Sequence, residues 1–305
     1  MSPGLVRGGE TPTPGTAGGP DPLRAPVRWR LRTREVPLDR PVVMGILNLT
    51  PDSFSDGGRF ADVDAQITRA HALVEEGADL LDVGGESTRP GATPVPVDEE
   101  LRRLEPFLAR LGEIPVPVSI DTRRAAVAER ALDAGVEIVN DVSGLSHDAT
   151  LAGVVARSGA ALVLMHMRGN PIDMTEWARY GDVVAEVRSE LAGALDYARS
   201  AGVEEARIVL DPGIGFAKSP DQSLALLHRL DGLHLLGRPL LVGPSRKRFL
   251  AGPEALPPDQ RVEGTLAACV VAWSRGARIF RVHDVRPARK ALDVAWRIDH
   301  AGASS

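Results

Sequence analysis

The stretch VVMGILNLTPDSFSDGG at residues 42–58 sets the pattern that decides the fold. A short apolar run ends at the polar residue Asn48, and a loop rich in proline, serine, aspartate and glycine precedes a segment of helical periodicity at residues 64–76. Short runs of valine, isoleucine and leucine are typical of strands that are buried on both faces of a parallel sheet. The stretch therefore predicts one strand–loop–helix unit of an α/β fold.

The same unit recurs along the chain, eight times in all. The apolar runs that predict strands begin at residues 42, 80, 117, 137, 161, 207, 239 and 278. The predicted helices lie at residues 64–76, 97–111, 124–134, 182–201, 222–230, 262–275 and 287–298. An open doubly wound sheet would show a similar alternation, but it gathers its reactive residues at one switch point. Polar residues at almost every strand end favour a closed (β/α)8 TIM barrel.

The region before the first unit has a different composition. Residues 1–25 are crowded with glycine, proline and threonine and lack apolar periodicity, which predicts a disordered tail. Residues 27–41 alternate loosely between apolar and polar positions, which predicts a short hairpin that plugs the bottom of the barrel. We therefore expect a tail at 1–25 and a single catalytic domain at 26–300.

Composition excludes several classes of function. With 43% hydrophobic and 25% charged residues the chain has enough apolar mass for a large core, and its net charge of −5 offers no basic stripe for nucleic acid. Cys269 is the only cysteine, so no intrachain disulfide can form, and a buried structural thiol is expected. No apolar run approaches the roughly 20 residues that span a bilayer, and no signal peptide is evident. These features predict a cytoplasmic protein without a membrane partner.

Polar residues close the predicted strands. In chain order they are Asn48, Asp82, Glu86, Asp121, Asn140, Asp141, His166, Asp211, Ser245, Arg246, Lys247, Arg281, His283 and Asp284. A single carboxylate at such a position is more often the N-cap of the next helix. Because all strands of a barrel end at one mouth, however, so many polar ends predict a common pocket.

The predicted pocket divides by charge. One side holds carboxylates and an amide, Asp121, Asn140 and Asp211, and the other holds the cations Arg89, Arg281 and His283. Carboxylates accept hydrogen bonds from the edge of a flat nitrogen heterocycle, whereas arginine and histidine suit phosphate oxygens. The pattern predicts a heterocyclic substrate that carries phosphate, with Lys247 between the two sides.

Two long loops lie at the same end of the predicted barrel. Residues 48–58 and 84–93 have the proline, serine and glycine content of mobile lids, although either is also consistent with a solvated surface loop. Phe54 and Phe216 are candidate walls for a planar ring in a chain with only 4% aromatic residues. Packing of these two rings in a core remains an alternative.

The strand ends together resemble a known family. The strings MGILNLTPDSFSDGG, DVGGESTRPGA, SIDT, NDVSG, LMHMRG, DPGIGFAK, SRKRF and RVHDV are similar, in this order, to the dihydropteroate synthases among the pterin-binding enzymes. The resemblance spans about residues 42–298. It implies a barrel that joins 4-aminobenzoate to 6-hydroxymethyl-7,8-dihydropterin diphosphate, giving 7,8-dihydropteroate and diphosphate in folate biosynthesis. Sulfonamides would be expected in the aminobenzoate slot.

The resemblance also implies roles for individual residues. The pterin would be held by Asp121, Asn140, Met165, Asp211, Lys247 and Arg281. The aminobenzoate would lie among Phe54, Thr88, Arg89, Pro90, Phe216 and Ser245. The diphosphate would be bound by Asn48, Arg89, Arg281 and His283, and Asn48 would also ligate a Mg²⁺ that keeps waters and bridges the diphosphate oxygens.

The implied chemistry is dissociative: diphosphate leaves first and the arylamine captures a pterin methylene cation. The residues expected to act in catalysis are Asp56, Asp121, Lys247 and Arg281, with Asp56 of the first loop stabilising the cation as a hypothesis. A homodimer is also implied by the resemblance. Departures from the family pattern include Leu49, Ala217 and Pro244, of which Pro244 restricts the turn before Ser245.

Two alternatives remain open at this point. A pterin-dependent methyltransferase domain would share the barrel and the acidic pterin contacts but would not need the cations that bind diphosphate. A non-catalytic pterin-binding paralogue would be expected to lose loop or cation residues. The intact loop and cation residues favour the synthase.

Overall fold

The computed structural model describes residues 28–49, 59–89 and 91–301, and eight of the strands in these ranges form one parallel sheet. Its order is β8-β7-β6-β5-β4-β3-β10-β9. The strands are β3 (Val42–Asn48), β4 (Leu80–Gly84), β5 (Val118–Asp121), β6 (Ile138–Asp141), β7 (Ala161–Met165), β8 (Ile208–Asp211), β9 (Leu241–Val242) and β10 (Ile279–Val282). A parallel bridge between Leu210 and Leu240 joins the two edges of the sheet. The predicted (β/α)8 barrel is confirmed.

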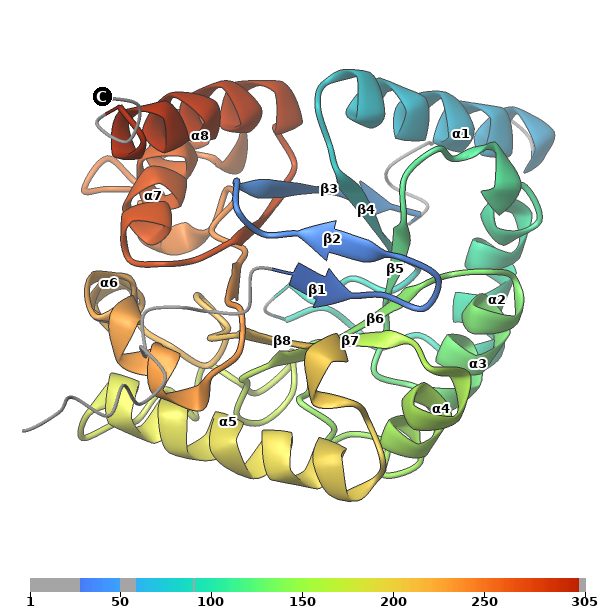
Figure 1. Cartoon of the computed structure of the whole chain (residues 1–305), viewed down its shortest axis with the longest axis horizontal. Helices are drawn as coiled ribbons and strands as arrows, with labels where there is room; N and C mark the ends of the chain where they lie inside the picture. Colours follow the sequence, from blue (N-terminus) through green and yellow to red (C-terminus); the bar gives the residue numbers. More distant parts are fainter. Residues whose placement is uncertain (1–27, 50–58, 90, 302–305) are drawn as a thin grey trace, which may run out of the picture.

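Helices surround the sheet (Figure 1). The α-helices are α1 (Arg59–Glu75), α2 (Val97–Leu108), α3 (Ala125–Asp133), α4 (Leu151–Ser158), α5 (Val183–Ser200), α6 (Pro220–His228), α7 (Val262–Ser274) and α8 (Val285–Asp299). Short 3₁₀ turns are η2 (Leu111–Glu113), η3 (Glu205–Arg207), η4 (Leu230–Leu236), η5 (Arg248–Leu250) and η6 (Pro258–Gln260). Within these described ranges no helix has the length and apolarity needed to cross a bilayer.

The predicted helices are confirmed to within a few residues at most ends, and one helix was missed. The sequence did not predict α4, which is only eight residues long and has a glycine, Gly153, near its start. Four of its residues are nevertheless buried in the main hydrophobic core: Leu151, Ala152, Val154 and Val155. A short helix of this kind is stabilised by packing rather than by propensity. The predicted disordered tail at residues 1–25 lies outside the described residues.

A hairpin closes the N-terminal end of the barrel. Strands β1 (Arg28–Arg30) and β2 (Glu35–Pro37) pair antiparallel and cross the middle of the ring of helices in Figure 1. Trp29 is fully buried, and its indole nitrogen donates a 2.8 Å hydrogen bond to the carbonyl oxygen of Arg207. The apolar hairpin residues share one cluster with the first residues of several strands, among them Val42, Leu80, Ile138 and Ile279. The predicted plug is therefore confirmed.

The plug makes a testable contribution to stability. We expect Trp29→Ala to lower the free energy of unfolding by about 3–5 kcal/mol, because it removes the largest side chain of a closed cluster and leaves a cavity. Chemical denaturation measures the change. The matched control is Trp177→Ala, since Trp177 is 53% exposed, and it should cost less than about 1 kcal/mol. Equal losses in the two variants would contradict the role of the hairpin.

Candidate active site

The apolar layer that packs against the hairpin is called here the floor of the barrel, and the opposite end, where the strands finish, is its mouth. In several strands the polar residue of the mouth lies two positions after the apolar residue of the floor. Along β4, Leu80 belongs to the floor cluster and Asp82 follows it on the same face, while Leu81 points outward to the helices. The same spacing of two residues separates a floor residue from a mouth residue in three other strands: Ile138 and Asn140, Val209 and Asp211, and Ile279 and Arg281. Because side chains alternate along a strand, one register sets both the packed floor and the charged mouth.

Arg281 ties the acidic side of the mouth together. Its Nε donates to Oδ2 of Asp82 at 2.6 Å, and its Nη2 donates to Oδ2 of Asp121 at 2.7 Å. The side-chain amide of Asn140 donates to the same Asp82 oxygen at 3.0 Å. These four residues come from four different strands, so the predicted convergence is confirmed. The sequence names Asp82 only as one of the polar strand ends and gives it no role, whereas the structure places it, fully buried, at the centre of the cluster.

In this cluster, burial and neighbouring charges shift the pKa values in opposite directions. Burial raises the pKa of Asp121, and the guanidinium of Arg281 only partly offsets that effect. Burial alone would lower the pKa of Arg281, but the charges of Asp82 and Asp121 outweigh it and raise the pKa. The guanidinium therefore stays charged, as arginine does in proteins.

Two carboxylate oxygens of the cluster lack partners. Within the described part of the chain, Oδ1 of Asp82 and Oδ1 of Asp121 are buried and accept no hydrogen bond. A buried acceptor left without a donor costs about 1–3 kcal/mol, so such atoms generally mark a place where a donor binds. The two oxygens fit the N–H groups of a planar heterocycle.

Asp211 and Lys247 lie near enough to each other in the mouth that each affects the pKa of the other. Asp211 is buried, which raises its pKa against the opposing effect of Lys247, and it accepts a 2.7 Å hydrogen bond from the backbone of Gly213. Burial lowers the pKa of Lys247 to about 8, although Asp211 acts in the other direction. The aliphatic stem of Lys247 lies against Gly215, where a Cβ would be only 2.9 Å from it. Only glycine at position 215 leaves this path open to the lysine.

Phe216 lies beside Lys247, as expected for a wall of the pocket. The ammonium nitrogen of Lys247 is 4.5 Å from the centre of the Phe216 ring and donates to the carbonyl oxygen of Ile214. Met165, buried at the end of β7, pairs in register with Asp211 on β8. The residues predicted to hold the pterin therefore lie at neighbouring strand ends, and their individual roles stay predictions.

His283 is held as a neutral hydrogen-bond donor. Burial and the charge of Arg281 lower its pKa to about 3, and Arg246 and Arg89 add to the effect. The backbone N–H of His283 donates to Oγ of Ser245 at 3.1 Å, and that Oγ lies 3.0 Å from Nδ1 of the ring. When the Ser245 hydroxyl donates to Nδ1, the ring carries its proton on Nε2.

The positive charges of the basic side therefore act on the same region of the mouth. Arg89 and Arg281 both lower the pKa of His283, so their charges reach the same ring. An anion with several oxygens fits two guanidinium groups and a neutral imidazole N–H. Asn48 ends β3 half-buried at the same end of the barrel. Of the other predicted residues, Thr88 is half-buried and Arg89 exposed, whereas Phe54, Asp56 and Pro90 lie outside the described residues.

The turn that carries Lys247 is held by residues outside the pocket. Arg246 has a φ of 58°, in the left-handed region that costs a non-glycine residue roughly 1–2 kcal/mol. Its guanidinium binds both oxygens of Asp284, at 2.9 and 2.5 Å, and its backbone N–H donates to the hydroxyl of Thr265 at 3.0 Å. Arg246 and Asp284 therefore support the site structurally.

Arg124 clamps the second loop at both ends. Its guanidinium donates to Glu86 at 2.5 Å where the loop begins and to the carbonyl oxygen of Val95 at 2.7 Å where it ends. Between these points the backbone N–H of Gly91 donates to the carbonyl oxygen of Pro171 at 2.8 Å. The segment with Thr88 and Arg89 is thus fixed at its base and near its tip, which favours a positioned loop over a free surface loop.

Fold and site together define a (β/α)8-barrel enzyme with a charged pocket for a planar, anionic ligand. The family model described as "Pterin binding enzyme" matches residues 44–283. The dihydropteroate synthase of Synechocystis sp. is 48% identical over 263 residues, covering 85% of this chain and 91% of the relative. The chain belongs to the pterin-binding enzyme family.

Solved structures agree with this assignment. The structure of Xanthomonas albilineans dihydropteroate synthase with 4-aminobenzoic acid is 45% identical with a TM-score of 0.84, covering 91% of this chain and 99% of that chain. The Burkholderia cenocepacia dihydropteroate synthase complexed with 7,8-dihydropteroate is 42% identical with a TM-score of 0.81, covering 92% and 99%. The expected resemblance is confirmed.

Asp82 offers a test of the acidic cluster. We expect Asp82→Asn to weaken binding of a pterin by roughly 10- to 100-fold, because it removes a charged acceptor that the ligand and Arg281 share. Calorimetric titration with 6-hydroxymethylpterin measures the dissociation constant. Asp293→Asn on α8 is the control, since that carboxylate is exposed. Unchanged affinity in Asp82→Asn would rule out this part of the pterin site.

Proposed function

We propose that the chain catalyses the dihydropteroate synthase reaction, joining 4-aminobenzoate to 6-hydroxymethyl-7,8-dihydropterin diphosphate. The observation that carries the proposal is a cluster of carboxylates and cations from several strands at one barrel mouth. Among the residues that the structure describes, Asp82 and Asp121 each keep one buried oxygen without a hydrogen-bond partner, and Arg281, which pairs with both of them, also acts with Arg89 on His283. The relatives reported above carry the name of this activity.

Different site residues act in different steps of the proposed reaction. The bond between the pterin methylene carbon and the diphosphate oxygen breaks first, and its electron pair leaves with the diphosphate. Arg89, Arg281 and neutral His283 stabilise the negative charge on that leaving group. Asp121 and Asp211 hold the pterin ring through hydrogen bonds of their carboxyl groups. The lone pair of the aminobenzoate nitrogen then forms the C–N bond, and the nitrogen loses a proton.

The aminobenzoate subsite is proposed beside Phe216 and the turn at Ser245. The ring of Phe216 provides an apolar face, and the ammonium of Lys247, 4.5 Å from that ring, supplies positive charge near a carboxylate. Thr88 and Arg89 of the clamped second loop would close the other side, together with the predicted contacts of Phe54 and Pro90. Sulfonamides that mimic aminobenzoate are expected to compete for this slot.

A Mg²⁺ ion is proposed to accompany the diphosphate, with Asn48 as its protein ligand. The side-chain amide oxygen of Asn48, at the half-buried end of β3, is the type of oxygen ligand that a hard cation such as Mg²⁺ accepts. When bound, the ion would neutralise charge on the leaving group.

The other function classes fit less well. A methyltransferase domain would share the pterin contacts but has no use for the cations around His283. A non-catalytic paralogue would not need the oriented Ser245–His283 pair or the clamped second loop. The relatives also favour the synthase over both alternatives.

Assembly and location remain proposals. We expect a homodimer, because Val271 on α7 and Val294 and Ile298 on α8 are exposed apolar side chains on helices that pack together. Sedimentation velocity at micromolar concentration would decide between one and two copies. A cytoplasmic location is supported by Cys269, the only cysteine, which is buried and free.

The direct test is an assay for product. The purified protein, given dihydropterin diphosphate and Mg²⁺, is expected to form dihydropteroate and release diphosphate only when 4-aminobenzoate is present. Chelation of Mg²⁺ should suppress turnover while binding of 6-hydroxymethylpterin, which has no diphosphate, stays the same. Tight pterin binding without dihydropteroate under any condition would overturn the proposal in favour of a binding paralogue.

The hypothesis for Asp56 is tested in the same assay. We expect Asp56→Asn to lower the turnover number, since a carboxylate near the methylene cation stabilises it electrostatically. The Michaelis constants of both substrates should change less than the turnover number does. An unchanged turnover number would remove Asp56 from the mechanism.

A further inference from the structure

Lys218 is a buried lysine behind the pocket that the steps above do not use. The chain has only three lysines among its 36 basic residues, at positions 218, 247 and 290. Two of them donate hydrogen bonds to backbone carbonyls of one loop, residues 213–217. Lys247 approaches this loop from the side of the pocket, and Lys218 lies at its far end with 7% of its surface exposed. A chain that uses arginine almost everywhere thus places two compact cations on the loop that carries Phe216.

The ammonium of Lys218 has three partners. It lies 3.1 Å from the carbonyl oxygen of Gly213, 3.0 Å from that of Phe216 and 2.9 Å from Nδ1 of His166. Burial lowers the pKa of Lys218 to about 7, and in its ammonium form the side chain has three N–H donors, one for each of these partners. A planar guanidinium on a longer stem cannot direct donors to three acceptors around one point, which explains a lysine here.

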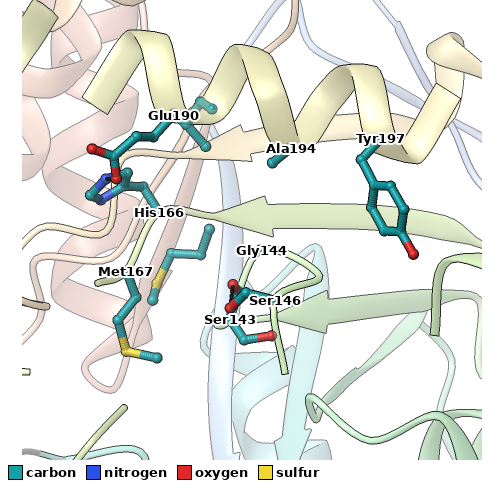
Figure 2. Close-up of a pocket in the computed structure, with 10 residues that line it drawn as sticks. Ser143, Gly144, Ser146, His166, Met167, Glu190, Ala194 and Tyr197 are labelled. Carbon is teal, nitrogen blue, oxygen red and sulfur yellow. Dashed lines mark hydrogen bonds and ion pairs between the residues drawn. The ribbon is translucent and has the colours of Figure 1, made fainter. Parts of the chain in front are cut away.

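His166 connects this ammonium to helix α5. Its Nε2 lies 2.9 Å from a carboxylate oxygen of Glu190, and Figure 2 shows the two side chains facing each other from the end of β7 and from α5. Arg168 donates to the other oxygen of Glu190 at 3.0 Å. Burial lowers the pKa of His166 to about 4, so the ring is neutral, accepts from Lys218 at Nδ1 and donates from Nε2. The tautomer is fixed from both sides.

The adjacent pocket in Figure 2 does not account for this arrangement. It has a volume of about 260 Å³ and is lined in part by His166, Met167 and Glu190. Its polar groups are largely satisfied within the protein, since Ser146 donates to Ser143 and Tyr197 donates to Ala149. Two of the three hydrogen bonds of Lys218 go to the loop with Phe216, and only the third reaches a residue that lines this pocket, His166.

That loop has a backbone that needs external support. Gly213, Gly215 and Ala217 all have positive φ, at 65°, 81° and 45°. Ala217 is not a glycine, and a side chain in the left-handed region is strained. Strained backbone persists where surrounding contacts determine it. The two carbonyls that Lys218 binds, those of Gly213 and Phe216, lie within this stretch. Its ammonium is therefore placed to hold the conformation of the loop.

We propose that Lys218 is a positioning residue that shapes the aminobenzoate subsite by fixing the 213–217 loop, with His166 and Glu190 holding its ammonium in place. As a consequence, Phe216 and Lys247 are held at a set distance from each other. Lys218 itself does not touch the substrate. The proposal rests on the proposed function for the identity of the ligand. The part that concerns the loop depends only on the geometry of the protein.

Hydrogen exchange tests the loop independently of activity. In Lys218→Met, backbone amides in a peptide covering residues 211–218 should exchange at least about tenfold faster, since the loop loses hydrogen bonds that hold it closed. A peptide from β3 should be unaffected. Lys290→Met, a lysine exposed on α8, is the matched control and should leave both peptides unchanged. Unchanged exchange at 211–218 in Lys218→Met would overturn the proposal.

Kinetics of the same variants test the effect on the subsite. We expect the KM for 4-aminobenzoate to rise about tenfold in Lys218→Met, with less than about a twofold change in the KM for dihydropterin diphosphate. A merely structural role would raise both constants or reduce the active fraction. Faster exchange with an unchanged aminobenzoate KM would overturn the assignment to this subsite. If the native chain forms no dihydropteroate, the proposed function fails while the exchange result still decides the role of Lys218 in the loop.

A second variant covers the case in which Lys218→Met does not fold. Glu190→Ala keeps a good helix former on α5, and Glu190 is partly exposed, so the fold should tolerate it. Arg168 retains its 2.8 Å contact with Glu186. The change removes the hydrogen-bond partner of Nε2 of His166, so the imidazole that binds Lys218 is held less firmly, and exchange at 211–218 should rise several-fold, as expected for loss of roughly one hydrogen bond. No change there would count against a chain of contacts from α5 to the loop.

Discussion

The pairing of Arg281 with Asp82 and Asp121 is the interaction on which the rest of the site depends. A buried carboxylate without a counter-charge would take up a proton, and a buried guanidinium without one would be strongly destabilising. At 2.6 and 2.7 Å the guanidinium pairs with one oxygen of each carboxylate and joins the ends of β10, β4 and β5. Asn140 on β6 adds a fourth strand. The charges therefore fix the shape of the mouth as well as its chemistry.

The floor of the barrel makes that mouth possible. A charged cluster gives little net stability, because desolvation offsets much of the attraction between its members. Stability comes instead from the apolar layer two residues earlier in each strand and from the hairpin that closes it, where Trp29 is fully buried. The strand period of two keeps these layers in register. Floor and mouth are thus consequences of one alternation, with stability at one end and chemistry at the other.

Much of this arrangement could be predicted from the sequence because it follows from local periodicity. Strand runs, polar strand ends and the plug are patterns of adjacent residues, and the barrel brings the strand ends together. Asp82 was named as a polar strand end but given no role, since nothing local distinguishes it from Asp141, whose carboxylate instead accepts from the backbone N–H groups of Ser143 and Leu145 in the following turn. The role of Arg124 depends on partners 24 to 38 residues away. Contacts of that kind are set by packing and are not encoded in any short pattern.

The loop after β8 is where the geometric demands on the chain are greatest. It must place an aromatic ring beside a lysine while three of its backbone positions have positive φ. Glycine satisfies that demand at 213 and 215, but position 217 is alanine, so part of the conformation must be maintained by contacts outside the loop. Lysines on both sides supply those contacts by donating to three of its carbonyl groups. An ammonium can do this at short range in several directions, whereas the arginines of the mouth bind carboxylates in a plane. In this loop, therefore, two lysines bind the backbone carbonyls, whereas Arg281 at the mouth binds the two carboxylates.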